Sequence, residues 1–329
     1  MQLPKGPNQC ITDVPGVKTG HVTLYEPINH EDTICTGVTA ILPHTGNLFQ
    51  HKVRAASHII NGYGKTAGLV QVNELGLLES PIMLTNTFSV GAIMQGTLQY
   101  MLEQNPEIGD TASSLNLVVG ECNDSYLNSM RLQAVKPDHA VEAIEQAADG
   151  PIEEGAVGAG KGMVSFDCKG GIGTASRVVD DYTVGGLVLS NFGKSEDARF
   201  ADFSPDRKAA QDGSIMIVIA TDAPLDHRQL ERLAKRSAAG LGRTGSYFAH
   251  GSGDIAIAFS TANQTAPYQQ TAEETITAVR DTHPIMNKLF QAVADTTEDA
   301  IISSLKHAET TTGRKGRVVE AGARYIHNW

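Results

Sequence analysis

The sequence predicts a mixed α/β protein in which both faces of each sheet are covered. Short apolar runs alternate with amphipathic helical patterns along the chain, which is typical of that class. Most apolar runs lack the alternation of a strand with one wet face, and SIMIVIAT at 214–221 is the most apolar of them. With 41% hydrophobic and 19% charged residues, the composition fits a folded globular chain and argues against disorder.

Strands are predicted where short apolar runs are bounded by glycine and polar residues. In chain order they are expected at 37–42, 82–85, 115–121, 162–167, 184–190, 215–221 and 254–260. Helices are predicted where apolar residues recur at intervals of three and four. They are expected at 50–60, 90–104, 138–148, 226–241 and 285–308.

The two C-terminal helices have the clearest periodicity. One face of the helix at 226–241 carries Leu230, Leu233, Ala234, Ala238 and Leu241, and one face of the helix at 285–308 carries Leu289, Phe290, Val293, Ile301, Ile302 and Leu305. Asp226 is expected to cap the start of the first of these helices, and Gly240 or Gly242 its end.

Composition and charge exclude several functions. The formal net charge is −11 and the isoelectric point is near 5.4, so the surface repels phosphate backbones and no nucleic-acid partner is expected. No stretch approaches the roughly 18 apolar residues of a membrane span. Residues 1–17 lack the apolar run of a signal peptide. We therefore expect a cytoplasmic protein with no membrane partner.

Metal and nucleotide sites are also not expected. Cys10, Cys35, Cys122 and Cys168 show neither a C-x-x-C pair nor zinc-module spacing, which predicts reduced thiols, no metal and no cofactor. GAVGAGK at 155–161 begins like a P-loop, but a glycine follows the lysine and no strand precedes it. The GxGxxG at 240–245 follows a helix rather than a strand, so helix capping and a turn explain it better.

A Ser-His-Asp triad has little support. The eleven histidines are scattered, and no G-x-S-x-G elbow follows a predicted strand. His250 lies near the GSGD segment and is interpreted as a surface histidine, with a supporting role at a site as the weaker alternative. The chain changes character at one point instead. Residues 194–213 are polar and turn-rich, as in an exposed loop, and the apolar strand begins at Ser214 directly after them.

Many segments in a fixed order resemble the L-aminopeptidase/D-esterase and β-peptidyl aminopeptidase family. They cover nearly the whole chain. They are ITDVPGVKTGH at 11–21, ELG at 74–76, PIMLTNTFSVG at 81–91, ECNDSYLN at 121–128, GAVGAGKG at 155–162, LSNFG at 189–193, GSIMIVIATDAPL at 213–225, GRTGS at 242–246 and GSGD at 251–254.

The resemblance implies an αββα sandwich of four layers, like that of N-terminal-nucleophile hydrolases but with altered strand connectivity. It also implies a single domain, residues 1–329, that cleaves itself between Gly213 and Ser214 into chains 1–213 and 214–329. Such enzymes release N-terminal residues from short peptides, amides or esters, and some accept β-peptides. They are usually oligomeric, so a tetramer of cleaved units is expected. The alternatives are an acyltransferase like the ornithine acetyltransferases, whose nucleophile is threonine, and a non-enzymatic relative that binds a small metabolite.

The resemblance assigns the catalytic residues. A free α-amine has a pKa of roughly 7.7–8.0, so an N-terminal Ser214 would carry its own base. Asn191 matches the family's catalytic asparagine, which binds the oxyanion of the intermediate, although asparagine before Phe-Gly is also typical of a turn. Tyr126 matches an active-site tyrosine that binds the oxyanion or steadies the nucleophile. It could equally be an aromatic residue that only packs.

Two carboxylates complete the expected site. Ser252 and Asp254 match a pair that orients the new amine, although some members have glutamate there and Asp254 could be only a turn residue. An aminopeptidase must also bind the substrate's ammonium group, for which a carboxylate is the natural partner. Glu121, at the end of the strand LNLVVGE, is the first candidate, followed by Asp124 and Glu74. An ordinary solvated carboxylate is the alternative for Glu121.

Overall fold

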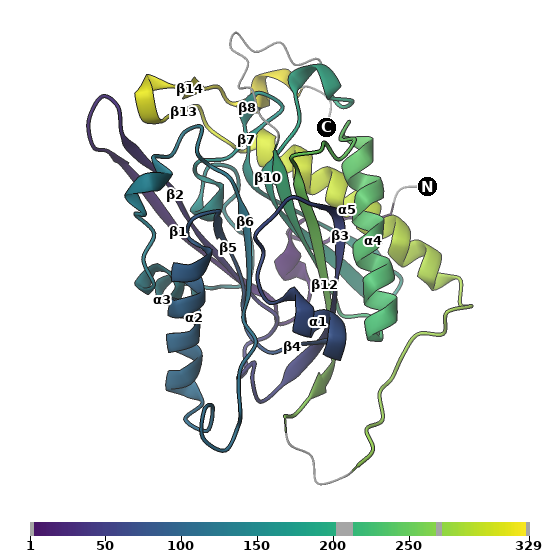
Figure 1. Cartoon of the computed structure of the whole chain (residues 1–329). Coiled ribbons are helices and arrows are strands. Elements are labelled where there is room, and N and C mark those ends of the chain that lie inside the picture. The colour runs from purple at the N-terminus through teal and green to yellow at the C-terminus, as the bar shows by residue number, and fades with distance from the viewer. Residues whose placement is uncertain (1–2, 202–212, 268–271, 327–329) are drawn as a thin grey trace.

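The computed structural model describes residues 3–201, 213–267 and 272–326. Its helices and sheets form four layers (Figure 1). Helices α2 (Val90–Gln104) and α3 (Asp138–Glu145) cover a four-stranded sheet, and a six-stranded sheet packs against the other face of that sheet. Helices α4 (His227–Arg243) and α5 (Ile285–Lys306) cover the outer face of the six-stranded sheet. The expected αββα sandwich is confirmed.

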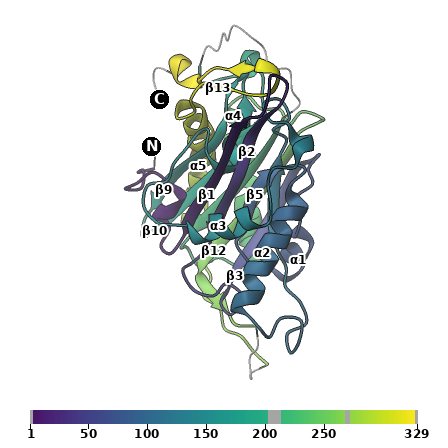
Figure 2. The same cartoon turned by 90° about the vertical axis from the view of Figure 1, so that its left-hand side faces the viewer.

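The four-stranded sheet has the order β1-β2-β5-β6. Its strands are β1 (Lys18–Pro27), β2 (Thr33–Leu42), β5 (Ile82–Asn86) and β6 (Val118–Cys122). Only the β5–β6 pair is parallel, because α2 lies between these strands in the chain and returns the backbone to the same end of the sheet. The turned view in Figure 2 shows α2 and α3 lying across this sheet.

The six-stranded sheet has the order β4-β3-β12-β11-β10-β9. Its strands are β3 (Lys52–Gly62), β4 (Leu77–Leu78), β9 (Gly171–Val179), β10 (Tyr182–Asn191), β11 (Ser214–Thr221) and β12 (Gly253–Thr265). The β11–β12 pair is parallel and the other pairs are antiparallel. Helix α1 (Leu69–Leu75) and the two-stranded ladders β7 (Val164–Ser165) with β8 (Cys168–Lys169) and β13 (Thr311–Thr312) with β14 (Val318–Val319) complete the regular structure of the described residues.

Strand β11 shows why the sheets are buried on both faces. All its residues are buried, and successive side chains point to opposite faces. Ile215, Ile217 and Ile219 join the core under α4 and α5. Met216 and Val218 join the core between the sheets. Burying each such side chain contributes about 1.5–3 kcal/mol, so this strand is held firmly in place.

One predicted helix is wrong. The segment expected as a helix at 50–60 is strand β3, which pairs antiparallel with β12. Val53 and Ala55 are buried between the sheets, whereas Ala56 is buried on the α4 side. Apolar residues spaced closely enough for a helix also fit a strand with two buried faces. Pairing with a strand far away in the chain then decides between the two structures.

The other elements agree with the predictions more closely. Helix α2 occupies 90–104 as expected, and Asp226 caps α4 by accepting a hydrogen bond from the Gln229 N–H. The predicted glycine end of α4 is wrong, because the helix continues to Arg243 and ends at Thr244. Gly240 has a packing role instead, since a Cβ there would lie 2.3 Å from the Ala294 carbonyl oxygen of α5.

Several elements were not predicted, and two strands are shorter than expected. Strands β1 and β9, helix α1 and the two-residue strands β4, β8, β13 and β14 are additional, while the strands expected at 115–121 and 162–167 are β6 at 118–122 and β7 at 164–165. Strand β9 contains Gly173, where a Cβ would lie 2.0 Å from the Ala300 carbonyl oxygen. Glycine is therefore present there because α5 packs close to the sheet, and it weakens the strand signal in the sequence.

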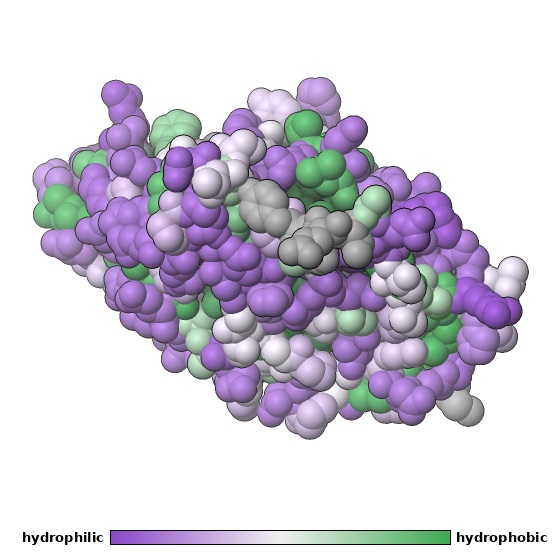
Figure 3. All heavy atoms as spheres, turned by 90° about the horizontal axis from the view of Figure 1, so that it is seen from below, coloured by the Kyte–Doolittle hydropathy of each residue, from purple (hydrophilic) through white to green (hydrophobic). Residues whose placement is uncertain are grey.

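The exposed surface is consistent with the composition. Seen from below, the molecule is mainly hydrophilic and its apolar residues lie in small separate groups (Figure 3). No helix in the described ranges is long and apolar enough to cross a membrane. All four cysteines are buried and unpaired.

Candidate active site

Ser214 lies where three strands of the six-stranded sheet meet. It is the first residue of β11 and stands opposite Asn191, the last residue of β10, and Gly253, the first residue of β12. Its hydroxyl accepts a hydrogen bond from the Gly253 N–H at 3.2 Å, and the residue is 8% exposed. The apolar sequence of β11 therefore fixes the backbone of a serine that still reaches the surface.

Gly213 is packed too tightly for any side chain. A Cβ there would lie 2.1 Å from the Asn191 carbonyl oxygen and 2.3 Å from the Phe192 Cα. Only glycine fits at this position, directly before Ser214. Most of the loop expected at 194–213 lies outside the described residues, so its exposure stays a prediction.

The Asn191 side chain is oriented by two backbone groups. Its Oδ1 accepts a hydrogen bond from the Val164 N–H at 2.9 Å, and its Nδ2 donates to the Asn123 carbonyl at 3.0 Å. These contacts orient the amide. They use one N–H of Nδ2, and the described residues provide no acceptor for the second. Because Asn191 is 5% exposed, its amide lies in a largely dry environment, where a hydrogen bond to a charged oxygen is strong.

The hydrogen bonds around Asn191 continue to a buried lysine. The Lys169 ammonium donates hydrogen bonds to the carbonyls of Gly160, Met163 and Gly170 at 2.7–2.9 Å. Met163 supplies the carbonyl of the same peptide group whose N–H binds Asn191. Burial lowers the pKa of Lys169 to about 7. This lysine therefore fixes the β7–β8 hairpin against the end of β10.

Ser252 and Asp254 form a pair beside Ser214. The Ser252 hydroxyl donates a hydrogen bond to Asp254 Oδ1 at 2.5 Å. Asp254 is completely buried, and within the described structure its Oδ2 has no hydrogen-bond partner. Burial raises the pKa of this carboxyl to about 6, and the hydrogen bond from Ser252 opposes the shift. A buried oxygen with no partner is costly unless a donor arrives.

Glu121 shares a cavity with Ser214. It is 3% exposed, and its carboxylate accepts hydrogen bonds from the Lys65 N–H at 2.8 Å and from the Thr87 hydroxyl. The cavity has a volume of about 200 Å³ and is lined by Tyr63, Lys65, Thr87, Glu121, Asn123, Ser214, His250 and Gly251. The structure thus brings together the predicted nucleophile and the first predicted carboxylate.

Sequence reasoning missed most of the cavity wall. Tyr63 and Lys65 follow β3, which was predicted as a helix. His250 is exposed, as its interpretation as a surface histidine expects, and it also lines the cavity. The Tyr63 N–H donates to the Ser252 carbonyl at 3.3 Å, which joins this wall to the GSGD segment. The glycines on either side of Tyr63 were the available signal, since they indicate a turn beyond a strand.

Three other candidates lie away from this cavity. Tyr126 is half-buried among apolar side chains, and the Arg317 guanidinium lies 4.6 Å from its ring centroid. Asp124 is fully buried and accepts a hydrogen bond from Asn128, and burial raises its pKa to about 7. Glu74 is exposed on α1. None of the three lines the cavity at Ser214.

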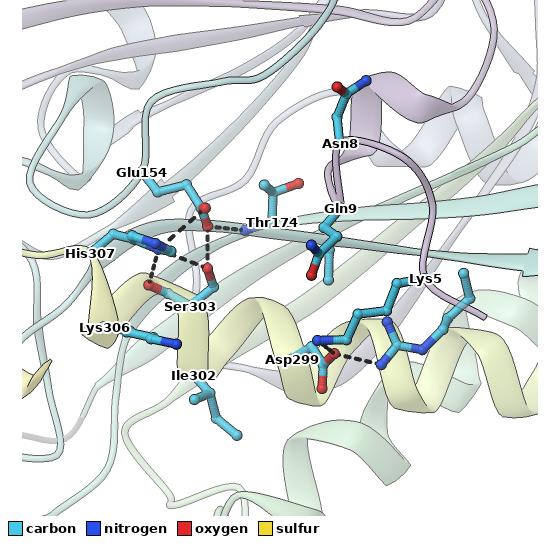
Figure 4. A pocket seen from close by; sticks show the side chains of 12 residues that line it. Lys5, Asn8, Gln9, Glu154, Thr174, Asp299, Ile302, Ser303, Lys306 and His307 are labelled. Atoms are coloured by element: carbon cyan, nitrogen blue, oxygen red, sulfur yellow. Dashed lines mark hydrogen bonds and ion pairs between the residues drawn. The ribbon is translucent and has the colours of Figure 1, made fainter. Parts of the chain in front are cut away.

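A second cavity, of about 360 Å³, lies between the N-terminal segment, β9 and α5 (Figure 4). It contains a serine, a histidine and a glutamate side by side. The Ser303 hydroxyl donates to Glu154 Oε2 at 2.6 Å and lies 3.0 Å from His307 Nδ1, and the same nitrogen faces Glu154 Oε1 at 3.3 Å. In a catalytic triad the serine and the carboxylate bind opposite nitrogens of the histidine. This cluster therefore has the residues of a triad without its geometry.

The described part of the chain offers no metal site. No group of three or more His, Cys, Asp or Glu side chains within it is arranged to hold an ion. The segment 155–161 forms a buried turn around the 3₁₀ helix Gly158–Gly160, which packs against β2 rather than opening toward solvent.

Comparison with known proteins identifies relatives over nearly the full length. The family model for peptidase family S58 matches residues 9–319. The beta-peptidyl aminopeptidase BapA of Sphingosinicella microcystinivorans is 38% identical over 345 residues, which cover 96% of this chain and 85% of that protein.

Solved structures show the same fold. The PH0078 protein of Pyrococcus horikoshii OT3 has a TM-score of 0.91 and 50% identity, with 98% of this chain and 93% of that chain covered. The L-aminopeptidase D-Ala-esterase/amidase of Ochrobactrum anthropi has a TM-score of 0.90 and 33% identity, again over 98% and 93%. The latter is described as a prototype for the serine aminopeptidases and a new variant of the Ntn hydrolase fold.

Proposed function

The chain belongs to peptidase family S58 and is a peptide-bond hydrolase, and from this premise we propose that it is a self-cleaving serine aminopeptidase with Ser214 as its nucleophile. The observation that carries the proposal is the place of Ser214. It follows a glycine that admits no side chain, begins a central strand, and shares a cavity with Glu121.

In the proposed first step, the Ser214 hydroxyl oxygen attacks the Gly213 carbonyl carbon. A C–O ester bond forms, the C–N bond between the two residues breaks, and the hydroxyl proton passes to the departing nitrogen. Water then hydrolyses the ester, which leaves the Gly213 carboxylate and regenerates the Ser214 hydroxyl. The absence of a Cβ on Gly213 supports this step, because the carbonyl carbon is unhindered and the backbone adapts to a strained angle.

Cleavage would give Ser214 an α-amine beside Asp254. The amine then takes the hydroxyl proton during attack on a substrate and returns it to the leaving amine. Asp254 Oδ2 supports this role, because it is buried, has no described partner and belongs to the strand that pairs with β11. In the proposed mature enzyme, a positive charge next to Asp254 would bring its pKa back down, since opposite charges favour the ionised carboxylate.

Asn191 is the proposed oxyanion donor. Its amide is fixed by the Val164 N–H and the Asn123 carbonyl, which is the preorganisation that such a donor needs. Tyr126 was assigned a similar role by the resemblance. That role stays a prediction, because its ring packs beside Arg317 outside the cavity.

Glu121 is the proposed partner of the substrate's ammonium group. The Lys65 N–H and the Thr87 hydroxyl hold its two oxygens in place, and a cavity of about 200 Å³ suits a short substrate. The relatives are a β-peptidyl aminopeptidase and an L-aminopeptidase with D-Ala-esterase/amidase activity. We therefore infer that the enzyme releases N-terminal residues from short peptides, amides or esters, and that its substrates include β-peptides.

Intact-mass analysis of the purified protein tests the mechanism directly. We expect two masses, for residues 1–213 and 214–329, and a new N-terminal serine. An uncut protein that still hydrolyses aminoacyl amides would rule out the mechanism. Products formed with an added amine acceptor separate hydrolysis from acyl transfer. The tetramer of cleaved units and the cytoplasmic location stay predictions.

A further inference from the structure

The cavity at Ser214 has a cationic and aromatic wall that the proposed mechanism does not use. The Lys65 ammonium lies 4.6 Å from the centroid of the Tyr63 ring. The Tyr63 ring is in turn 6.4 Å from the His250 ring, at an angle of 49°. All three residues line the same cavity as Ser214 and Glu121. Opposite charges therefore share one small space with the nucleophile.

Lys65 bonds to Glu121 through its backbone and not through its ammonium group. The backbone N–H of Lys65 donates to Glu121 Oε1 at 2.8 Å, whereas the side chain turns away over Tyr63. None of the ion pairs found among the described residues includes Lys65. The two charged groups thus line one cavity without forming a direct ion pair.

Tyr63 explains how this separation persists. A lysine over an exposed tyrosine ring is stabilised about as much as a lysine in an exposed ion pair. The ring therefore competes with the Glu121 carboxylate for the Lys65 ammonium. If Lys65 paired with Glu121 instead, the carboxylate would already be neutralised when a substrate ammonium arrived.

We propose that Lys65 binds the C-terminal carboxylate of the substrate, so that the preferred substrates are short peptides with both ends free. The inference rests on the proposed function, because it takes Glu121 as the site of the substrate's ammonium group. Lysine suits this role, because its flexible stem and three ammonium donors adapt to leaving groups of different length. Charges of both signs held apart in one cavity match a zwitterion better than a peptide amide or an ester.

A pair of substrates isolates the contribution of the carboxylate. We would compare an alanyl dipeptide with the same dipeptide as its C-terminal amide, and repeat the comparison with the β-alanyl forms. For the wild type we expect kcat/KM to be about five- to tenfold higher for the free acid, mostly through KM, because a charged hydrogen bond is lost with the amide. The preference should shrink as the salt concentration rises.

Lys65→Gln tests the residue itself. The variant keeps the backbone N–H that binds Glu121, so we expect it to lose the preference for the acid, with the ratio of kcat/KM for acid over amide falling to about one. Lys161→Gln is the matched control, because the Lys161 ammonium lies 4.7 Å from the Tyr25 ring in the same kind of contact outside the cavity. The control should keep the full preference. Cleavage into two chains reports that each variant has folded.

Tyr63→Leu gives an independent readout. Without the ring, Lys65 is free to pair with Glu121, so we expect KM to rise for the acid and the amide together. The double variant Tyr63→Leu with Lys65→Gln should then recover the KM of the single Lys65→Gln variant.

The failure of the inference differs from the failure of the proposed function. If the wild type cleaves acid and amide equally well, or if Lys65→Gln slows both alike, Lys65 does not bind the carboxylate, although the aminopeptidase activity stands. If the wild type stays uncut and cleaves neither the acid nor the amide, the proposed function fails and the inference fails with it.

Discussion

Ser214 and Ser303 each line a cavity, and their surroundings differ in an instructive way. Ser303 has the neighbours expected of a nucleophile, since its hydroxyl lies within 3.0 Å of a histidine nitrogen and donates to a glutamate (Figure 4). The Ser214 hydroxyl accepts a hydrogen bond from the Gly253 N–H, and within the described residues it forms none with a histidine or a glutamate, although His250 and Glu121 line its cavity. Residue type alone would favour Ser303, whereas the geometry favours Ser214.

The difference lies in where the hydroxyl proton can go. At Ser303 the proton points to Glu154, and the histidine presents the same nitrogen to both side chains. That arrangement stabilises the hydroxyl and does not activate it. At Ser214 the proposed acceptor is the residue's own nitrogen, which would become an amine only after cleavage. The presence of catalytic residue types near a serine is therefore weaker evidence for a nucleophile than a group placed to accept its hydroxyl proton.

Removing each hydroxyl in turn gives the largest expected contrast. Ser214→Ala should leave the chain uncut and abolish peptide hydrolysis, because both reactions need the same oxygen. Ser303→Ala should be cut normally and keep its kcat, because the Ser303 hydroxyl has only a structural partner. A denaturing gel and a peptidase assay measure both outcomes. Loss of activity in Ser303→Ala with normal folding would reverse our assignment of the two serines.

Asn191 provides the next largest effect. Asn191→Ala should lower kcat by about 10²–10³ with a smaller change in KM, as expected for a lost oxyanion donor. Aspartate has the same size as asparagine but cannot donate a hydrogen bond when ionised, so Asn191→Asp should lower kcat by as much. An aspartate variant with near wild-type kcat would show that the amide only shapes the end of β10.

Substituting the two glutamates compares the cavities themselves. Glu121→Gln should raise KM about tenfold for aminoacyl amides, because the charge that holds the substrate ammonium is lost, while the Lys65 N–H can still donate to the amide oxygen and the Thr87 hydroxyl can accept from the amide nitrogen. Glu154→Gln is the control in the other cavity, and steady-state kinetics should find its KM unchanged. Equal effects of the two substitutions would argue for a general loss of negative charge instead.

The smallest expected effect is a slope of stability with pH. In uncut Ser214→Ala, burial raises the pKa of Asp254 from 3.8 to about 6, so the folded state binds more protons than the unfolded state between these values. This carboxyl therefore lowers the free energy of unfolding as the pH rises from 4 to 7, by up to about 3 kcal/mol. Adding Asp254→Asn should flatten that part of the slope.

Urea unfolding of the uncut protein with and without Asp254→Asn measures this difference. Asp124, whose pKa burial raises to about 7, titrates in both proteins and cancels in the comparison. An identical slope in the two proteins would show that Asp254 is not the buried acid responsible.

The boundary at Ser214 and the carboxylate at Glu121 were predictable because both mark abrupt changes of polarity. A polar stretch of sequence stops where the apolar strand β11 begins, and Glu121 is the charged residue at the end of the apolar run LNLVVGE. The apolar strands indicate that both faces of each sheet are covered, and the resemblance supplies the four layers.

The rest of the site depends on contacts between segments far apart in the chain. Tyr63 and Lys65 reach the cavity because β3 pairs with β12, which places Gly62 opposite Gly253. Local periodicity indicates a helix there and gives no sign of that partner. His250 looks like any surface histidine in the sequence, and only the fold brings it beside Tyr63.

The central position of β11 has a consequence for refolding. β11 is hydrogen-bonded to β10, which precedes the Gly213–Ser214 bond, and to β12, which follows it, while β12 is paired with β3 from the N-terminal part. Cutting the bond would thus divide a single sheet between two polypeptides without separating them. An uncut variant should refold in a reaction independent of protein concentration. The cleaved enzyme, once denatured, must find its other half by diffusion, so its recovery should follow second-order kinetics and its midpoint of unfolding should shift with dilution.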